Sequence, residues 1–144
     1  MWIAILALSC LLSVALARIV GISVPKTIAP GEVSNAILLT EKYTQPVSDV
    51  AIAFGVAPGA GFPGNLGTTL KSLYLGPEKS NTLTNITVAI DPVPQSIALG
   101  AATLSATLYS LYGTSSSAVL TNFAVAVAIA NVTSSEYVSS NGSF

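Results

Sequence analysis

Two stretches decide the fold: AATLSATLYSLY at residues 101–112 and VLTNFAVAVAIA at residues 119–130. In both, large apolar residues alternate with small or polar ones, which is typical of a β-strand that buries one face. The expected buried faces carry Leu104, Ala106 and Leu108 in the first stretch and Phe123, Val125, Val127 and Ile129 in the second. The opposite faces carry Thr103, Ser105, Thr107 and Tyr109, and Asn122, Ala124, Ala126 and Ala128. We therefore predict two long strands.

The rest of the chain uses the same residue types. Val, Ile, Thr, Ala and Tyr dominate, and Gly and Pro punctuate them, as strands and turns require. Further strands are predicted at about 18–24, 35–43, 47–56, 70–75 and 83–90. The pattern predicts an all-β fold, an immunoglobulin-like antiparallel β-sandwich of about seven strands. A closed barrel is the structural alternative.

The stretch 47–56 also alternates. Val50, Ile52, Phe54 and Val56 share one predicted face, and Asp49, Ala51, Ala53 and Gly55 share the other. If this strand neighbours the two long ones, their common outer face is flat, uncharged and made of small residues. Such a face suits docking against another protein. It makes Ala124 and Ala126 partner-binding candidates, although alanine is also simply tolerated on exposed strands.

The composition excludes several functions. The chain has 144 residues, 51% of them hydrophobic, with five basic and six acidic residues and no histidine. This length indicates one domain, and the few, balanced charges argue against nucleic-acid binding. Without histidine, Ser-His-Asp catalysis and most zinc sites are excluded. We expect no catalytic residues, no metal site and no cofactor.

The N-terminal segment has the features of a secretory signal peptide. Residues 1–17 hold a short apolar run that closes with the A-x-A pattern at Ala15 and Ala17, which predicts cleavage between Ala17 and Arg18. The run is short for a membrane span, so a stable membrane anchor is not expected. Residues 18–132 are predicted to form the β-sandwich domain, and 133–144 a polar, flexible tail. The protein is expected to be secreted and extracellular.

Three sequons agree with the secretory route. They make Asn85, Asn131 and Asn141 candidates for glycosylation. Glycans there would supply hydration that the few charged side chains do not.

Two segments carry features of recognition loops. GAGFPG at residues 59–64 matches G-x-G-x-x-G, but the prolines and the following residues do not begin the helix that a dinucleotide site needs. We interpret it as a loop at one end of the sandwich and Phe62 as a partner-binding candidate. Tyr109 and Tyr112 precede a serine-rich turn, a composition found in adaptable protein-binding loops. Tyrosine also caps cores with its hydroxyl in water, and both interpretations stay open.

Paired carboxylates could support glycoside hydrolysis without histidine. The six acidic residues are scattered, mostly at turns. An enzyme is therefore not predicted; carbohydrate-active chemistry at Asp49 or Asp91 is the weaker alternative.

Several blocks in order resemble a known family. RIVGI at residues 18–22, DVAIAFG at 49–55, FPGNLG at 62–67, LYLGP at 73–77 and LYSLYGTSS at 108–116 are similar to the fungal necrosis-inducing secreted protein family. The resemblance implies a secreted effector that binds host receptor-like or receptor-associated kinases and suppresses pattern-triggered immunity. It also implies cell death in some plants. Secretion leaves later entry into host cells open as an alternative to action outside them. The competing hypothesis is a structural or adhesion module of the fungal cell wall.

Overall fold

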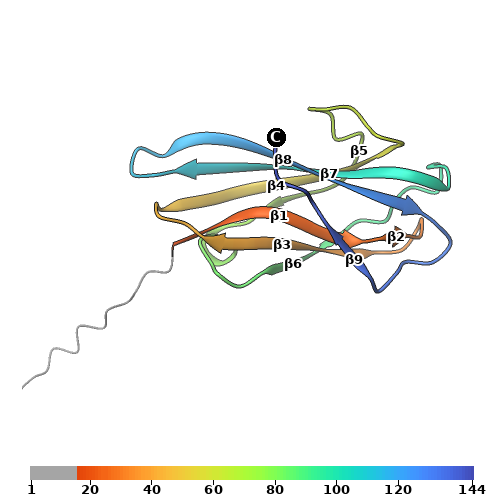
Figure 1. The fold of residues 1–144 in the computed structure, drawn as a ribbon, viewed down its shortest axis with the longest axis horizontal. Coiled ribbons are helices and arrows are strands. Elements are labelled where there is room, and N and C mark those ends of the chain that lie inside the picture. Colours follow the sequence, from red (N-terminus) through yellow and green to blue (C-terminus); the bar gives the residue numbers. More distant parts are fainter. Residues whose placement is uncertain (1–15) are drawn as a thin grey trace, which may run out of the picture.

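The structure, a computed structural model, describes residues 16–144, and Figure 1 shows two layers of strands. One short 3-10 helix, η1 (Pro77–Lys79), interrupts the described part of the chain. The strands are β1 (Ala17–Pro25), β2 (Thr27–Ile28), β3 (Ser34–Lys42), β4 (Val47–Pro58), β5 (Thr68–Tyr74), β6 (Ile86–Ile90), β7 (Gly100–Tyr112), β8 (Ser117–Ile129) and β9 (Tyr137–Ser139). No helix in this described part is long and apolar enough to cross a membrane.

The strands form two sheets. The four-stranded sheet has the order β6-β3-β1-β9, and the five-stranded sheet has the order β2-β8-β7-β4-β5. Every strand pair is antiparallel except β2 with β8. The prediction of an all-β antiparallel sandwich is confirmed. The condition for a common outer face of 47–56 and the two long stretches is met, because β4, β7 and β8 are adjacent.

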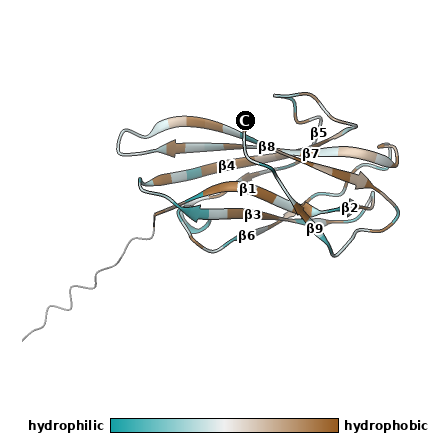
Figure 2. Cartoon of the chain, in the orientation of Figure 1, coloured by the Kyte–Doolittle hydropathy of each residue, from teal (hydrophilic) through white to brown (hydrophobic). Residues whose placement is uncertain are grey.

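The core lies between the two sheets. Figure 2 shows brown, hydrophobic bands that recur along the strands, as the period-two pattern requires. Each large apolar side chain buried there contributes about 1.5–3 kcal/mol. The largest fully buried side chains include Phe54, Phe123, Ile22, Leu38, Ile52, Leu104, Leu108 and Ile129.

A β-bulge in β4 corrects one predicted face. The register of β4 with β7 shifts between Asp49 and Ala51, so Val50 is an extra residue with no partner on β7. One extra residue reverses the alternation before it. Asp49 therefore points into the core with 1% of its surface exposed, and the prediction that it shares the outer face with Ala51 is wrong.

The C-terminal residues lie against the sandwich. The sequence pattern suggests a separate polar tail from residue 133, but β9 pairs with Ser23, Val24 and Pro25 of β1. Beyond β9 the chain crosses from one sheet to the other (Figure 1), where Phe144 and Asn122 exchange two backbone hydrogen bonds of 3.1 Å. The path of this segment is therefore set by hydrogen bonds to both sheets.

Candidate docking surface

The outer face of the five-stranded sheet contains a row of large apolar side chains. Strand register places Tyr74 of β5 opposite Ala51 of β4, Ala51 opposite Tyr109 of β7, and Tyr109 opposite Leu120 of β8. The exposed fractions are 71% for Tyr74, 38% for Tyr109 and 67% for Leu120. Four adjacent strands thus present one continuous row to solvent. Neighbouring side chains in such a row lie within contact distance across the strands.

The adjoining rows are small and uncharged. We define the docking face as the first row together with three others: Ser72, Ala53, Thr107 and Asn122; Ser105 and Ala124; and Ala57, Thr103 and Ala126. A shallow groove of about 380 Å³ lies between the two tyrosines, with Ala51, Ala53 and Thr107 among its lining residues. Alanine and serine lie between the large aromatic side chains, so the surface of the docking face is uneven. Because the face has no charged group, a partner that covers it does not have to remove water from a charge.

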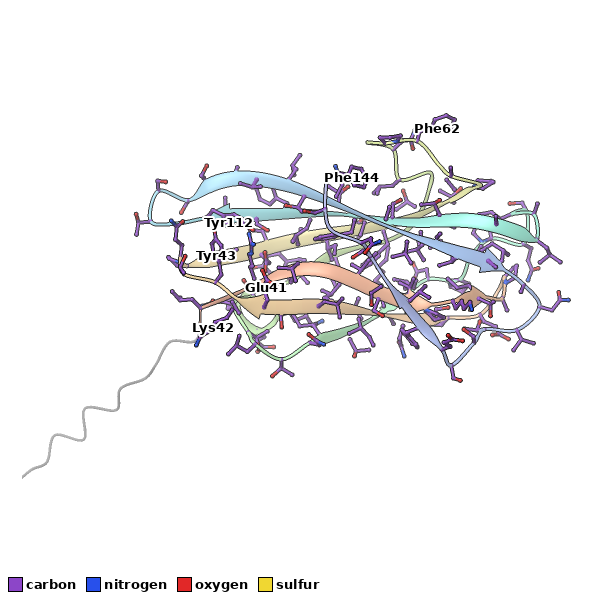
Figure 3. All side chains as sticks on the ribbon, in the orientation of Figure 1. Glu41, Lys42, Tyr43, Phe62, Tyr112 and Phe144 are labelled. Atoms are coloured by element: carbon purple, nitrogen blue, oxygen red, sulfur yellow. The ribbon has the colours of Figure 1, made fainter. Side chains whose placement is uncertain are left out.

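The loop between β4 and β5 rises above this face and exposes Phe62. Figure 3 shows Phe62 at the tip of the loop, and 78% of its surface is exposed. Thr103 Oγ1 donates a hydrogen bond of 2.7 Å to the carbonyl of Gly59 and ties the loop to β7. Phe62 and Asn65 form an isolated bridge within the loop. The loop predicted from GAGFPG therefore holds an aromatic ring beside the docking face.

Glycine makes the close approach of this loop possible. A methyl group at Gly55 in β4 would collide with the backbone and side chain of Leu66. Gly67, at a φ of 75°, returns the chain against the carbonyl of Val56. The glycines of this region thus serve the packing of loop against sheet.

Tyr112 lies apart from the docking face. Its ring meets the ring of Tyr43 edge to face, with centroids 5.6 Å apart and an interplanar angle of 82°. The Arg18 guanidinium lies 4.2 Å from the centre of the Tyr43 ring, and Arg18 Nη2 is 3.3 Å from Glu41 Oε1. The cluster of Tyr43, Tyr112 and Glu41 is visible at one end of the sandwich in Figure 3. Such aromatic and cation–π contacts stabilise a fold locally.

Asp49 links the two sheets. Its Oδ2 accepts a hydrogen bond of 3.1 Å from the backbone N–H of Ile19 in β1, and its Oδ1 accepts one of 2.6 Å from Ser110 Oγ in β7. Burial raises the pKa of the Asp49 carboxyl, although these two hydrogen bonds and the charge of Arg18 oppose the rise. Both oxygens of this carboxyl are thus engaged by the fold.

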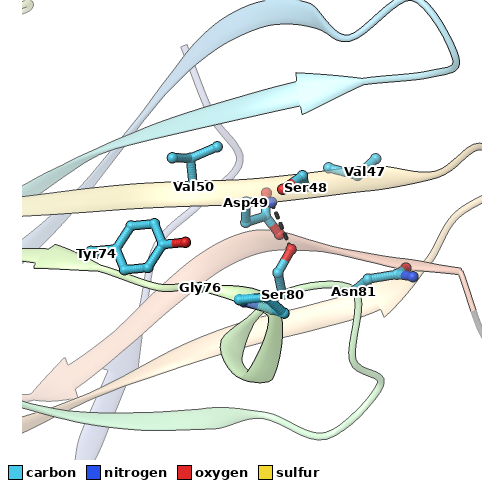
Figure 4. Close-up of a pocket in the computed structure, with 9 residues that line it drawn as sticks. Val47, Ser48, Asp49, Val50, Tyr74, Gly76, Ser80 and Asn81 are labelled. Carbon is cyan, nitrogen blue, oxygen red and sulfur yellow. Dashed lines mark hydrogen bonds between the residues drawn. The ribbon is translucent and has the colours of Figure 1, made fainter.

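A cavity of about 430 Å³ lies beside Asp49, between β4 and η1 (Figure 4). The backbone N–H of Asp49 donates a hydrogen bond of 2.7 Å to Ser80 Oγ, and Tyr74 and Asn81 also line the cavity. Among residues 16–144, no group of three His, Cys, Asp or Glu side chains is placed to hold a metal ion. The cavity offers hydroxyl and amide groups around a carboxyl whose oxygens already have partners.

The other predicted site residues lie away from this surface. Ala17 is the first residue of β1, its N–H donates to Asn81 Oδ1 at 2.8 Å, and the apolar run before it lies outside the described residues. Asn85, Asn131 and Asn141 are all exposed. Asn85 Oδ1 accepts a hydrogen bond of 3.1 Å from the N–H of Thr40.

The structure brings Tyr109, Ala124 and Ala126 onto one face with Phe62 beside it. Sequence reasoning missed Tyr74 and Leu120, which complete the row on either side of Tyr109. Both are large apolar residues on the polar side of an alternating strand, and that exception to the pattern could have found them. Asp91 also lies apart, 3.9 Å from Lys71 Nζ in a contact between the two sheets.

The two packed sheets place this protein in the class of all-β sandwiches, with exposed aromatic side chains on the outer face of the five-stranded sheet. Comparison with known proteins shows two relatives. The chain is 50% identical over 135 residues to "Necrosis-inducing secreted protein 1" of Colletotrichum orbiculare, a match that covers 93% of this chain and 83% of that protein. It is 48% identical over 137 residues to the protein of the same name from Colletotrichum higginsianum, covering 94% of each.

The chain belongs to the Nis1 family, whose model matches residues 15–128. It is therefore a member of a family of secreted, necrosis-inducing effectors of fungi, and the predicted resemblance is confirmed. The relatives are named as secreted proteins, and the expected secretion of this chain is confirmed with them.

Proposed function

We propose that this secreted effector acts by binding, not by catalysis. Its partner is a host receptor-like or receptor-associated kinase of the immune system, and its docking face occupies a surface that the kinase needs for signalling. Binding suppresses pattern-triggered immunity and, in some plants, leads to cell death. The observation that carries the proposal is the continuous row from Tyr74 through Ala51 and Tyr109 to Leu120.

The residue types of the docking face favour a protein partner. Tyrosine is enriched at the energetic centres of interfaces because its ring brings large apolar area at a low entropic cost. Small residues between the rings let a partner approach the sheet closely. The face lacks charge, whereas the Arg18–Glu41 pair sits on the opposite sheet. Binding should therefore depend on shape and apolar area more than on electrostatic attraction.

The relatives support the biological setting. Two proteins at about half identity carry a name that joins secretion with induction of necrosis. A protein that provokes cell death from outside the fungus must meet a component of the host. A surface that binds a host signalling protein can cause cell death without any enzymatic reaction.

The chemistry of the acidic residues fits a binding role. Glycoside hydrolysis needs two carboxyl groups that face each other across a substrate cleft. Asp49 is buried with both oxygens bonded to Ile19 and Ser110, and Asp91 is paired with Lys71. The Asp49 carboxyl thus supports the fold, and Asp91 faces a lysine in an exposed ion pair.

The proposal is tested by affinity purification of the secreted form from leaf tissue, followed by a kinase assay. We expect a receptor-associated kinase among the retained proteins and reduced phosphorylation by that kinase when the effector is added. Absence of a kinase, together with unchanged kinase activity, would contradict the proposal. Recovery in the fungal wall fraction, with no host response on infiltration, would instead favour the wall-module hypothesis.

A further inference from the structure

One edge of the five-stranded sheet is only partly covered. At the C-terminal end of β8, β2 pairs with Ala128 and Ile129. Near the middle, Phe144 exchanges hydrogen bonds with Asn122 in the antiparallel sense. On the neighbouring sheet, β9 covers only the Ser23–Pro25 end of β1. The side of the sandwich between the first half of β8 and the first half of β1 is therefore open.

The unpaired backbone groups on this edge follow from the alternation of hydrogen-bonding direction along β8. β7 and β8 are in continuous register from Ser117 to Ile129, so alternate residues of β8 direct their N–H and C=O away from β7. Asn122 and Ala128 use these outward groups to bond Phe144 and Lys26. The N–H and C=O groups of Ala118 and Leu120 also point away from β7, and within residues 16–144 they have no backbone partner on this side. An exposed row of this kind is a template for another strand.

A groove under the same edge provides places for side chains. A volume of about 310 Å³ lies between the two sheets here. Val119, Thr121 and Phe123 of β8 form one wall, and Arg18, Ile19 and Val20 of β1 contribute the other. The lining is completed by Glu41, Tyr112 and Ser143. A strand added to β8 would direct alternate side chains into this groove and leave the rest on the solvent side. The side chain nearest β8 would meet Val119, Thr121 and Phe123 and should be apolar, whereas the Arg18–Glu41 pair makes the β1 side of the groove charged.

We propose that the β8 edge from Ser117 to Thr121 receives an extended segment of the partner kinase, which runs antiparallel to β8 and inserts an apolar side chain between Thr121 and Ile19. The inference rests on the proposed function and deepens it. The Phe144–Asn122 pair shows the mode of pairing that this edge accepts. Leu120 belongs to both the edge and the docking face, so a partner that covers the face reaches the edge without a gap.

Two substitutions separate the edge from the docking face. Ala118→Pro removes one outward N–H, which edge strands tolerate, and changes little else. Thr121→Lys places a charge in the groove, because Thr121 points between the sheets and not onto the docking face. The matched control is Thr121→Val, which keeps the volume of the side chain and adds no charge to the groove. The probe is the recombinant cytoplasmic domain of a receptor-associated kinase from the host plant.

We expect Ala118→Pro and Thr121→Lys each to weaken kinase binding at least tenfold, with unchanged circular dichroism, while Thr121→Val binds like the wild type. In the wild-type complex, hydrogen exchange at the Ala118 and Leu120 amides should slow at least tenfold. Binding within twofold of wild type by both variants, with unchanged exchange at these amides, would overturn the edge proposal alone. Failure of the wild type to bind any such kinase would overturn the proposed function and this inference together. Analytical ultracentrifugation provides one more test. If the wild type forms a dimer that Ala118→Pro dissociates, and kinase binding is unaffected, the edge pairs with a second copy of this chain and the edge proposal is overturned.

Discussion

The backbone N–H of Ile19 donates a hydrogen bond of 3.1 Å to the Asp49 carboxylate, although the two residues belong to different sheets. The bond exists because the bulge at Val50 turns Asp49 inward, toward the open edge of β1. It gives a buried carboxyl a backbone donor in addition to Ser110 Oγ. The stability of the sandwich should therefore respond to this residue.

Asp49→Ala is predicted to lower the free energy of unfolding by about 1–3 kcal/mol, because it leaves the Ile19 N–H and the Ser110 hydroxyl buried without a partner. Urea denaturation checks the value. Ser110→Ala, which removes only one of the two donors, is the graded control, and it should cost less. Equal stability of Asp49→Ala and the wild type would contradict the assigned role.

The pH dependence of stability follows from the raised pKa of Asp49. Its ordinary pKa is 3.8, and burial raises the value in the folded state. The folded state then holds its proton more tightly than the unfolded chain, so this contribution to stability is full below the ordinary pKa and is lost as pH rises through the folded pKa. Asp49→Asn cannot lose a proton there. The stability of the wild type relative to Asp49→Asn should fall as pH rises from about 3 to 7 in urea titrations. A difference that is constant or grows with pH would contradict this assignment.

Gly55→Ala tests the packing of the loop that carries Phe62. The new methyl group would meet Leu66, so the variant should lose about 1–3 kcal/mol and release the loop from the sheet. Subtilisin, a protease of broad specificity, should then cleave the loop of residues 59–67 several times faster than in the wild type. Gly64→Ala is the matched control: its φ of 78° makes alanine strained, but no atom lies within 4 Å of the new methyl group. Similar loop cleavage in the two variants would argue against close packing at Gly55.

Deletion of residues 133–144 tests the contribution of the C-terminal segment. It removes β9 and the hydrogen bonds from Lys26 N to the Glu136 carbonyl, 2.9 Å, and from Ser140 N to the Ile22 carbonyl, 2.8 Å. At about 1 kcal/mol for each bond, the loss should total roughly 2–5 kcal/mol. Deletion of 141–144 keeps β9 and should cost much less. Thermal unfolding distinguishes the two, and equal melting temperatures for wild type and the longer deletion would contradict the contribution of this segment.

The sequence predicts the strands better than their registration. Alternation identifies β7 and β8 because thirteen-residue strands give the pattern many repeats. In β4 the run Val50, Ile52, Phe54 and Val56 alternates without a break, so nothing in the residue types marks the bulge that turns Asp49 inward. β2 and β9 have two and three residues and are too short for any periodicity.

The docking face could be predicted only in part for a related reason. Alternation assigns Tyr109 and Ala124 to outward positions, but it does not say which residues of different strands stand opposite each other. That depends on register, which the turns and the packing of the core determine. The row of Tyr74, Tyr109 and Leu120 therefore required the structure.

Weak dependence on salt is expected for partner binding. The docking face carries no charged residue, so screening of charges by added salt has little to weaken. The dissociation constant for the kinase domain should change less than about threefold between roughly 0.05 and 0.5 M sodium chloride. An interface held together by several ion pairs would lose far more affinity over the same range. A steep loss of affinity with salt would place the interface elsewhere on the molecule.

The central claim, that the outer face of the five-stranded sheet binds the kinase, is tested most directly by titration of the kinase domain with the double variant Ala124→Lys/Ala126→Lys. The two lysines extend from β8 across the face and must be desolvated on binding. The predicted result is a loss of affinity of at least tenfold, about 1.4 kcal/mol, with an unchanged unfolding free energy. Wild-type affinity in a correctly folded double variant would contradict the claim.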